Sequence, residues 1–439
     1  MIKSSEALKR KMEQDGIKNI MVAFSDIHGL HKGRVVPMSR FDFLLESGPA
    51  FTGGSVPGAG QGPEHPEMVA RADLDTYIPM SWLPGCAHFM SSLEVQGKPH
   101  PYCPRGNLQR VLAEAKNEGF VFNTGVELEH YTVTRDAGGK MSPWNPQGFD
   151  GAKMPGYNLN ALIPAYAYLT KMEDHLNSLG WGVYQVDHED GPSQWEINFQ
   201  YTDVLTTCDR AMYFRLAARH IAKQTLGSDV HVTFQAKPFP TSCGSGSHLH
   251  YHVADAETGK NMFLDHNDPR KLGLSQLAYH FLGGILKHAP ALCAITNPTP
   301  NCYDRLHPAK NPESGNHWVP SCILYSNDNR TVMVRVPEPG HCEDRTPSGA
   351  CNLYLANAAY VAAGLDGIKQ ELHPGDPHFG SALGNTKAKR LPDSIKDALD
   401  ELRQDDVVME ALGPIAEVFL KMKGEEKNVP SEGSYFQFV

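Results

Sequence analysis

The sequence predicts an α+β protein with a small N-terminal part and a larger C-terminal part. The first hundred of its 439 residues read as mixed strands and turns. A proline-rich stretch, KPHPYCPRGN at residues 98–107, is typical of a domain junction. Beyond this stretch, strand-like runs alternate with long helical patterns. At about 150 residues per domain, the length also fits two or three domains.

Local composition predicts the individual elements. Asn19–Asp26 (NIMVAFSD) is a short apolar run that ends at turn-forming residues, and it predicts a strand. Residues 46–66 are so rich in Gly, Pro and Ser that we expect a long loop, either functional or a plain surface excursion. The run NLQRVLAEAKNEG predicts a helix that Gly119 closes. Further helices are predicted at residues 164–179, 203–226, 272–288, 351–372 and 392–412.

Composition excludes several classes of protein. Lys and Arg total 40 against 50 Asp and Glu, a net charge of −10, which argues against a general nucleic-acid partner. The nine cysteines form no C-x-x-C pair, so we expect free thiols in a reducing compartment. No run of 18 apolar residues is present, and the polar N-terminus lacks the apolar stretch of a signal peptide. We therefore expect a cytoplasmic protein without a membrane partner.

Carboxylates recur in two strand-like segments. In GVELEHYTV, Glu127 and Glu129 are two residues apart and so share one face of a strand. Two carboxylates on one face repel each other unless a cation lies between them. A solvent-exposed strand face is the alternative interpretation of this pair. In HEDGPSQWEINF, Glu189 and Glu196 flank a Gly-Pro turn.

Histidines recur in the next segment, and arginines recur at residues 301–355. In KPFPTSCGSGSHLHYHV, His248, His250 and His252 alternate along one strand face after a glycine-rich loop. Taken singly, each of these histidines fits a structural role better than a ligand role. Carboxylates with an imidazole suit Mg²⁺ or Mn²⁺, and arginines suit phosphate or carboxylate groups. The residues predict a metal-dependent nucleotide enzyme. It is neither a P-loop enzyme nor a protein kinase, because neither a G-x-x-x-x-G-K-[ST] loop nor kinase motifs occur.

The motifs GVELE, EDGPSQWE, KPFPTSCGSGSHLH, NCYDRL, NDNRTVMVRVP and CEDRTPSGACNLYL together resemble the glutamine synthetase superfamily over nearly the whole chain. The resemblance implies a β-grasp N-terminal domain with an amine-side loop at residues 1–104 and an α+β catalytic domain at residues 105–439. It also implies a ring-shaped homo-oligomer, a dodecamer or alternatively a decamer, with active sites between neighbouring subunits. The implied reaction has two steps. ATP first phosphorylates the γ-carboxylate of glutamate, and an amine then displaces the phosphate.

The resemblance further implies roles for particular residues. One metal, Mg²⁺ or Mn²⁺, lies beside the glutamate and the amine, and its ligands match Glu129, Glu189 and Glu196. A second metal holds the ATP phosphates, and its ligands match Glu127, His248 and Glu343. Residues that bind glutamate match Gly244, His248, Arg305 and Arg345. Residues on the ATP and phosphate side match His250, Arg330 and Arg335, and we count Arg330 and Arg345 as catalytic.

Departures from the family pattern concern the amine. Thr52 stands where ammonia-using members carry an aspartate, and a neutral hydroxyl forgoes a charged hydrogen bond of about 1.5–3 kcal/mol. Glu313 is the candidate base in the altered segment HPAKNPESGNHWVP, whose Trp318 and Val319 suit an apolar pocket. The substrates expected are therefore glutamate, ATP and methylamine. Ammonia, as in a glutamine synthetase, or a larger amine are the alternatives; a catalytically inactive member conflicts with the retention of all six matched ligands.

Overall fold

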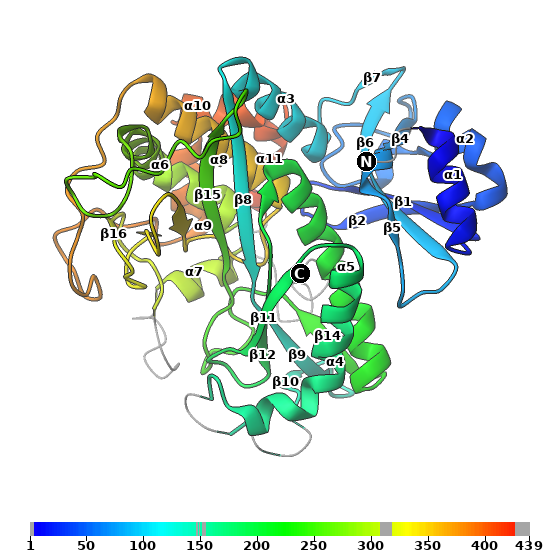
Figure 1. The fold of residues 1–439 in the computed structure, drawn as a ribbon, viewed down its shortest axis with the longest axis horizontal. Helices are drawn as coiled ribbons and strands as arrows, with labels where there is room; N and C mark the ends of the chain where they lie inside the picture. The colour runs from blue at the N-terminus through cyan, green and yellow to red at the C-terminus, as the bar shows by residue number, and fades with distance from the viewer. Residues whose placement is uncertain (1–3, 146–147, 149, 152–154, 308–317, 426–439) are drawn as a thin grey trace.

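The structure is a computed structural model that describes residues 4–145, 148, 150–151, 155–307 and 318–425. Its strands form three sheets, and helices cover them (Figure 1). The helices are α1 (Ser5–Gln14), α2 (Phe41–Glu46), α3 (Pro104–Asn117), α4 (Leu159–Ser178), α5 (Val204–Leu226), α6 (Gln276–Thr296), α7 (Pro300–Leu306), α8 (Leu353–Lys369), α9 (Ile395–Leu402), α10 (Asp406–Leu412) and α11 (Ile415–Glu425).

The first sheet is N-terminal and lies at the right of Figure 1. Its order is β2-β1-β6-β4-β3, with β5 and β7 paired to β6, and the central β1 and β6 run parallel. The strands are β1 (Asn19–Ser25), β2 (His31–Pro37), β3 (Ala50–Phe51), β4 (Met68–Ala72), β5 (Ile78–Pro79), β6 (Cys86–Val95) and β7 (Lys98–Pro99). The strand predicted at residues 19–26 is confirmed as β1.

Alternate residues of β6 face two different cores. Ala87 and Phe89 belong to a cluster that includes Leu8 and Met12 of α1. Cys86 and Met90 instead belong to the main core of the larger part of the chain. This alternation follows from the two-residue period of a strand. Because the main core takes side chains from both parts, the division at residues 104 and 105 remains a prediction.

Two further sheets carry the larger part of the chain. One has the order β10-β9-β12-β11 with β14 on β9, and the other has the order β13-β8-β15-β18-β17-β16. The first contains β9 (His130–Arg135), β10 (Met141–Pro143), β11 (Val183–His188), β12 (Gln194–Phe199) and β14 (Val230–Thr233). The second contains β8 (Phe120–Leu128), β13 (Thr202–Asp203), β15 (Ser247–Asp255), β16 (Tyr325–Ser326), β17 (Val334–Arg335) and β18 (Cys342–Asp344). In Figure 1 the long antiparallel pair β8 and β15 crosses the middle of the molecule.

Helices α6 and α8 are the apolar support behind these strands. Most residues of both helices are buried. Their backbones come close at two glycines: a Cβ on Gly284 would lie 2.0 Å from the carbonyl oxygen of Ala363, and one on Gly367 would lie 2.2 Å from that of His280. Any side chain at these positions would push the helices apart.

Several predicted boundaries were wrong, among them that of the helix predicted at residues 272–288, which is α6 at Gln276–Thr296. Capping side chains explain two of the differences. Helix α4 begins five residues before the predicted Pro164, because the side chain of Asn158 caps it by accepting the N–H of Asn160. The helix predicted at residues 392–412 is two helices, since Asp405 caps α10 and ends the first segment. The expected loop at residues 46–66 contains the two-residue strand β3 and a short 3₁₀ turn at Gly53–Ser55.

His288 links three helices and gives a first testable prediction. Its Nε2 lies 2.9 Å from Oδ2 of Asp366 on α8, and its Nδ1 lies 2.7 Å from Oδ2 of Asp405. Burial disfavours the charged ring, but the two aspartates outweigh burial and raise the pKa of His288. The charged ring therefore stabilises the fold at a pH below its unfolded pKa of about 6.5, and this stabilisation is lost as pH rises through the raised folded pKa.

We expect His288→Gln to lower the free energy of unfolding by about 1.5–3 kcal/mol at pH 6, the usual worth of hydrogen bonds to charged groups. The loss should be smaller at pH 9, because the charged form of the wild-type ring is less populated there than at pH 6. Urea unfolding of both proteins at the two pH values measures the difference. Equal losses at pH 6 and pH 9 would contradict an ionic role for this histidine.

Candidate active site

Strand register brings three distant segments to one point. His248 on β15 lies opposite Glu127 on β8. On its other side, β15 places His250 opposite Glu343 of β18, and β17 in turn places Arg335 opposite that same glutamate. Directly opposed residues point to the same face of a sheet. The acidic, imidazole and guanidinium groups that the sequence predicts as a site therefore share one face.

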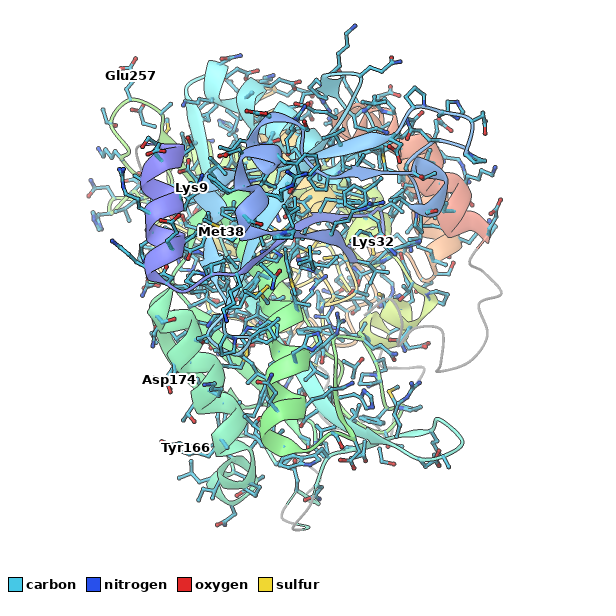
Figure 2. All side chains as sticks on the ribbon, turned by 90° about the vertical axis from the view of Figure 1, so that its right-hand side faces the viewer. Lys9, Lys32, Met38, Tyr166, Asp174 and Glu257 are labelled. Atoms are coloured by element: carbon cyan, nitrogen blue, oxygen red, sulfur yellow. The ribbon has the colours of Figure 1, made fainter. Side chains whose placement is uncertain are left out.

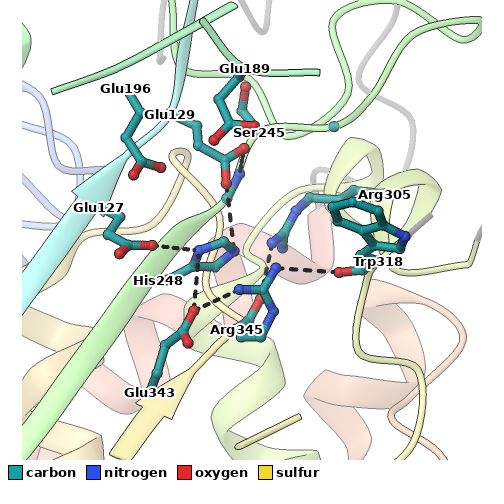
Figure 3. A network of polar contacts seen from close by, with 12 residues as sticks. Glu127, Glu129, Glu189, Glu196, Ser245, His248, Arg305, Trp318, Glu343 and Arg345 are labelled. Atoms are coloured by element: carbon teal, nitrogen blue, oxygen red, sulfur yellow. Dashed lines mark hydrogen bonds and ion pairs between the residues drawn. The ribbon is translucent and has the colours of Figure 1, made fainter. Parts of the chain in front are cut away.

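Glu127, His248 and Glu343 form a candidate cation site. One ligand atom from each lies within 4.8 Å of the others. Nδ1 of His248 is 3.0 Å from Oε2 of Glu127 and 3.6 Å from Oε1 of Glu343 (Figure 3). Burial opposes the charge on Glu127, but His250 and His248 hold the pKa of this carboxyl well below its usual value. Two carboxylates and one imidazole suit a divalent cation such as Mg²⁺ or Mn²⁺.

Glu129, Glu189 and Glu196 form a second acidic group beside the first. Figure 3 shows Glu189 next to Glu129, with Glu196 on the side of Glu127. Burial, together with Glu129 and Asp187, raises the pKa of Glu189 to about 8, and burial with Glu127, Glu189 and Glu129 raises that of Glu196. Among the described residues, the oxygens of this trio do not all lie within 4.8 Å of one another. The raised pKa values reflect repulsion among these carboxylates, which is expected of carboxylates that need a cation between them.

Glu129 connects the two acidic groups. Its Oε2 accepts hydrogen bonds from the Gly246 backbone N–H (2.8 Å) and from Nε2 of Gln194 (3.0 Å). Its Oε1 lies 3.5 Å from Nε2 of His248. The sequence interpretation assigned no role to Gln194, although its polar side chain at the start of a buried strand was a usable signal.

Three arginines of the site differ in their partners, which are either a carboxylate or backbone oxygens. Arg345 and Arg335 each donate to one oxygen of Glu343, at 2.6 and 2.8 Å. Against the effect of burial, Arg345, His250 and His248 lower the pKa of Glu343 to about 2. Arg305 is 4% exposed and donates to the backbone oxygens of Thr346 and Arg345, at 2.9 and 3.0 Å. In this structure Arg305 thus holds the loop that carries Arg345.

The glycines of the loop before β15 permit close packing. A Cβ on Gly244 would lie 2.7 Å from the carbonyl oxygen of Ala236 and 2.7 Å from Cγ of Arg305. A Cβ on Gly246 would lie 2.5 Å from Nε2 of His248 and 2.8 Å from a terminal nitrogen of Arg305. Glycine at these positions lets the loop pass between the imidazole and the guanidinium.

A cavity of about 590 Å³ opens beside the first acidic group. It contains the predicted phosphate-side residues His250, Arg330 and Arg335, together with Glu127. Its volume is in the usual range for small-molecule sites. Its walls also include aromatic and imidazole side chains that the sequence interpretation did not assign to the site: Tyr184, Tyr201, His252 and His341.

Other predicted residues lie apart from this cluster or outside the described chain. Thr52 lies between β3 and the turn at Gly53–Ser55, and no hydrogen bond or ion pair within the described ranges joins it to the acidic groups. Glu313 falls outside the described residues. Trp318 is 48% exposed, and its backbone oxygen accepts a 3.4 Å hydrogen bond from Arg345.

Known proteins are similar to this chain over most of its length. Residues 101–432 match the family model described as glutamine synthetase, catalytic domain. The chain belongs to the glutamine synthetase family. A glutamate–methylamine ligase from Methyloversatilis universalis is 37% identical over 423 residues, which cover 94% of this chain and 93% of that protein. A glutamine synthetase from Rhizobium meliloti is 36% identical over 420 residues, or 94% of each chain.

Solved structures agree with the family assignment. The structure described as "GmaS/ADP complex-Conformation 1" has a TM-score of 0.90 and 32% identity, and the match covers 97% of this chain and 98% of that one. The structure described as "Apo GmaS without ligand" has a TM-score of 0.88 at the same identity. The predicted α+β, glutamine synthetase-like fold is therefore confirmed. Within the described part of the chain, no helix combines the length and hydropathy needed to span a bilayer.

Proposed function

We propose that this glutamine synthetase family ligase joins glutamate to methylamine at the expense of ATP. An oxygen of the glutamate γ-carboxylate attacks the γ-phosphorus of ATP, and ADP leaves. The amine nitrogen then attacks the γ-carbonyl carbon of the acyl phosphate, and the amide forms as phosphate leaves and a proton is lost. The observation that carries the proposal is the shared face on which Glu127, His248 and Glu343 lie beside Arg335 and Arg345.

The acidic residues of this face would bind cations, and the arginines would bind phosphate groups. Bound divalent cations would neutralise phosphate oxygens, and Glu127, His248 and Glu343 fit one such ion. Arg330 in the adjoining cavity would bind the transferring phosphoryl group, and Arg345 the acyl phosphate. The cavity itself, with its aromatic walls, would accept the ATP nucleoside.

Methylamine is proposed over ammonia because of Thr52. A methyl group gains by apolar contact, about 0.8 kcal/mol for a buried carbon, whereas ammonium depends on charged contacts that threonine does not offer. The similarity to a glutamate–methylamine ligase supports this choice. The almost equal similarity to glutamine synthetases keeps ammonia as the second candidate.

An amine panel tests the proposal. Phosphate release that depends on glutamate and ATP should be measured with ammonium, methylamine, ethylamine and putrescine. We expect the highest kcat/KM for methylamine, and a shift toward ammonium in Thr52→Asp. A wild-type preference for ammonium would instead assign the protein as a glutamine synthetase.

We also propose that the protein forms a ring-shaped homo-oligomer. Leu159, Ile163 and Tyr166 lie three or four residues apart on α4 and are 69%, 64% and 61% exposed. Figure 2 shows Tyr166 projecting outward from this helix. An apolar stripe of this kind fits a contact between copies of the chain. The mass of the assembly in solution, by light scattering, tests this.

A further inference from the structure

A group of basic side chains lies between the N-terminal sheet and α5, away from the acidic groups. We call it the basic cluster, and its members come from β2, β6 and α5: His31, His88, Arg215 and Arg219. The ring centroids of His31 and His88 are 5.5 Å apart. The guanidinium carbons of Arg215 and Arg219 lie 5.8 and 5.6 Å from the centroid of one ring, that of Phe234. None of the four side chains lines the cavity described above.

Several buried nitrogens of the basic cluster have no hydrogen-bond partner among the described residues. They are Nε2 of His31, both ring nitrogens of His88 and Nε of Arg215. The side chains of His88 and Arg215 are deeply placed, since these residues are 1% and 6% exposed. A buried donor without an acceptor is destabilising, so this place suits a ligand that is rich in acceptor oxygens.

The charges of the basic cluster are also uncompensated. Burial lowers the pKa of Arg215, and burial together with Arg215 lowers the pKa of Arg219 to about 10. In the described parts of the chain, no carboxylate counteracts either effect. The aromatic ring of Phe234 offsets only part of the cost of burying a cation. Water could satisfy the unpartnered nitrogens, but only an anion also balances two positive charges.

We infer that the basic cluster binds a small oxyanion, either inorganic phosphate or a free carboxylate. The planar guanidinium groups of its two arginines match the oxygens of both kinds of ion and balance their charge. Each neutral imidazole adds one N–H donor. His31 and Arg219 are half-buried, so the ion reaches the cluster from solvent on their side. The buried His88 and Arg215 form the inner end of the site.

The oxyanion site lies next to a loop of the candidate active site. Both terminal nitrogens of Arg215 donate to the backbone oxygen of Cys351 at 3.2 Å. Cys351 ends the loop that runs from Arg345 to the start of α8. An ion bound at Nε of Arg215 holds the guanidinium group that supports this loop. The ion therefore stabilises the loop, together with the junction between the N-terminal sheet and α5.

Calorimetric titration of the full chain with phosphate, and separately with succinate, tests the inference at constant chloride. We expect saturable binding of at least one of the two ions, and the ion that binds identifies the source. Arg219→Gln should raise its Kd about tenfold or more, the factor that 1.4 kcal/mol corresponds to, and Arg219→Lys should fall between this variant and wild type. Lys223→Gln is the matched control, because it removes a positive charge from the exposed surface of α5 one turn further along. Its Kd should stay within twofold of wild type.

Thermal unfolding separates a binding role of Arg219 from a structural one. Without added oxyanion, Arg219→Gln should unfold at a temperature no lower than wild type, because it removes a charge that has no partner. The ion should then stabilise wild type and Lys223→Gln more than it stabilises Arg219→Gln, since stabilisation follows affinity.

Three results would overturn the inference: no saturable binding of either ion, binding that Arg219→Gln leaves unchanged, or a loss of stability in Arg219→Gln before any ion is added. If neither ion binds and light scattering shows a smaller assembly for Arg219→Gln, the partner of the cluster is instead a carboxylate of a second copy of the chain. None of these measurements depends on catalysis, so their outcome is separate from that of the amine panel.

Discussion

Replacing Glu129 by glutamine is expected to reduce amide synthesis on the order of a thousandfold or more, because bound metal contributes several kcal/mol to such reactions. Oε2 of Glu129 already accepts two hydrogen bonds, from Gly246 and Gln194. In the variant the amide oxygen must take that position. The NH₂ group would then face His248 and the acidic groups, where a cation requires an oxygen. The exchange therefore removes a ligand while it preserves the packing.

Turnover and thermal unfolding, each measured as a function of Mg²⁺, check this expectation. Both Glu129→Gln and the companion Glu196→Gln should show a smaller stabilisation by Mg²⁺ than wild type, since stabilisation follows metal affinity. Glu257→Gln, which alters an exposed carboxylate far from the site, should behave as wild type (Figure 2). Near-normal turnover of Glu129→Gln at saturating Mg²⁺ would remove Glu129 from the site.

The metal-free protein gives an independent readout at Glu196. Burial and the neighbouring carboxylates raise the folded pKa of Glu196, so the folded state holds a proton that the unfolded state releases. Stability must then fall as pH rises from the unfolded pKa of about 4.3 toward the raised folded value. Glu196→Gln removes this dependence. In the presence of a chelator at pH 7, the variant should unfold at a temperature no lower than wild type.

Replacing Arg330 by alanine is expected to lower kcat about a thousandfold, the scale seen when an arginine that neutralises a transferring phosphoryl group is removed. Arg335, in the same cavity, is already paired with Asp328 and Glu343. Arg330 is exposed at the cavity wall and makes no ion pair with another described residue. Its charge is therefore available where negative charge gathers on the transferred group.

ATP affinity and turnover must be measured separately for Arg330→Ala. We expect the Kd for ATP to change by less than about threefold, because ATP keeps its other contacts in the cavity and loses only a contact needed in the transition state. Arg403→Ala, at the exposed end of α9, is the control. An effect confined to ATP affinity would place Arg330 in binding and not in phosphoryl transfer.

Local sequence patterns predicted the elements that are set by their own residues. The apolar run at Asn19–Ser25 is a strand, and Asp203 begins α5 as its N-cap, one residue from the predicted start. Two predicted boundaries were wrong because a single capping side chain sets the helix end, at Asn158 and at Asp405. Such caps contribute about 1 kcal/mol, which is enough to move a helix end but leaves little trace in composition.

The residue types of the candidate site were readable from the sequence, and the family resemblance implied their grouping, but the contacts among them were not readable. Glu127 and Glu129 are close in the chain, so their shared strand face could be inferred. The placement of Glu343 between His250 and Arg335 depends on strand pairing among distant segments. The aromatic walls of the cavity could not be predicted either, because they come from segments far apart in the chain. The unpartnered nitrogens of His88 could not be predicted, because the absence of a hydrogen bond depends on the packing around it.

The sequence by itself determined that this protein is an α+β member of the glutamine synthetase family, and it predicted which carboxylates, histidines and arginines would carry its chemistry. The fold class and the residue types can be predicted because periodicity and motif spacing depend on residues that are close together in the chain. Only the tertiary structure decided which charges are compensated. Arginines and histidines already hold Glu343 and Glu127 in their charged forms, whereas Glu189 and Glu196 are left to repel each other. That difference arises from burial and distance, which the packing of β8, β15, β18 and β12 sets.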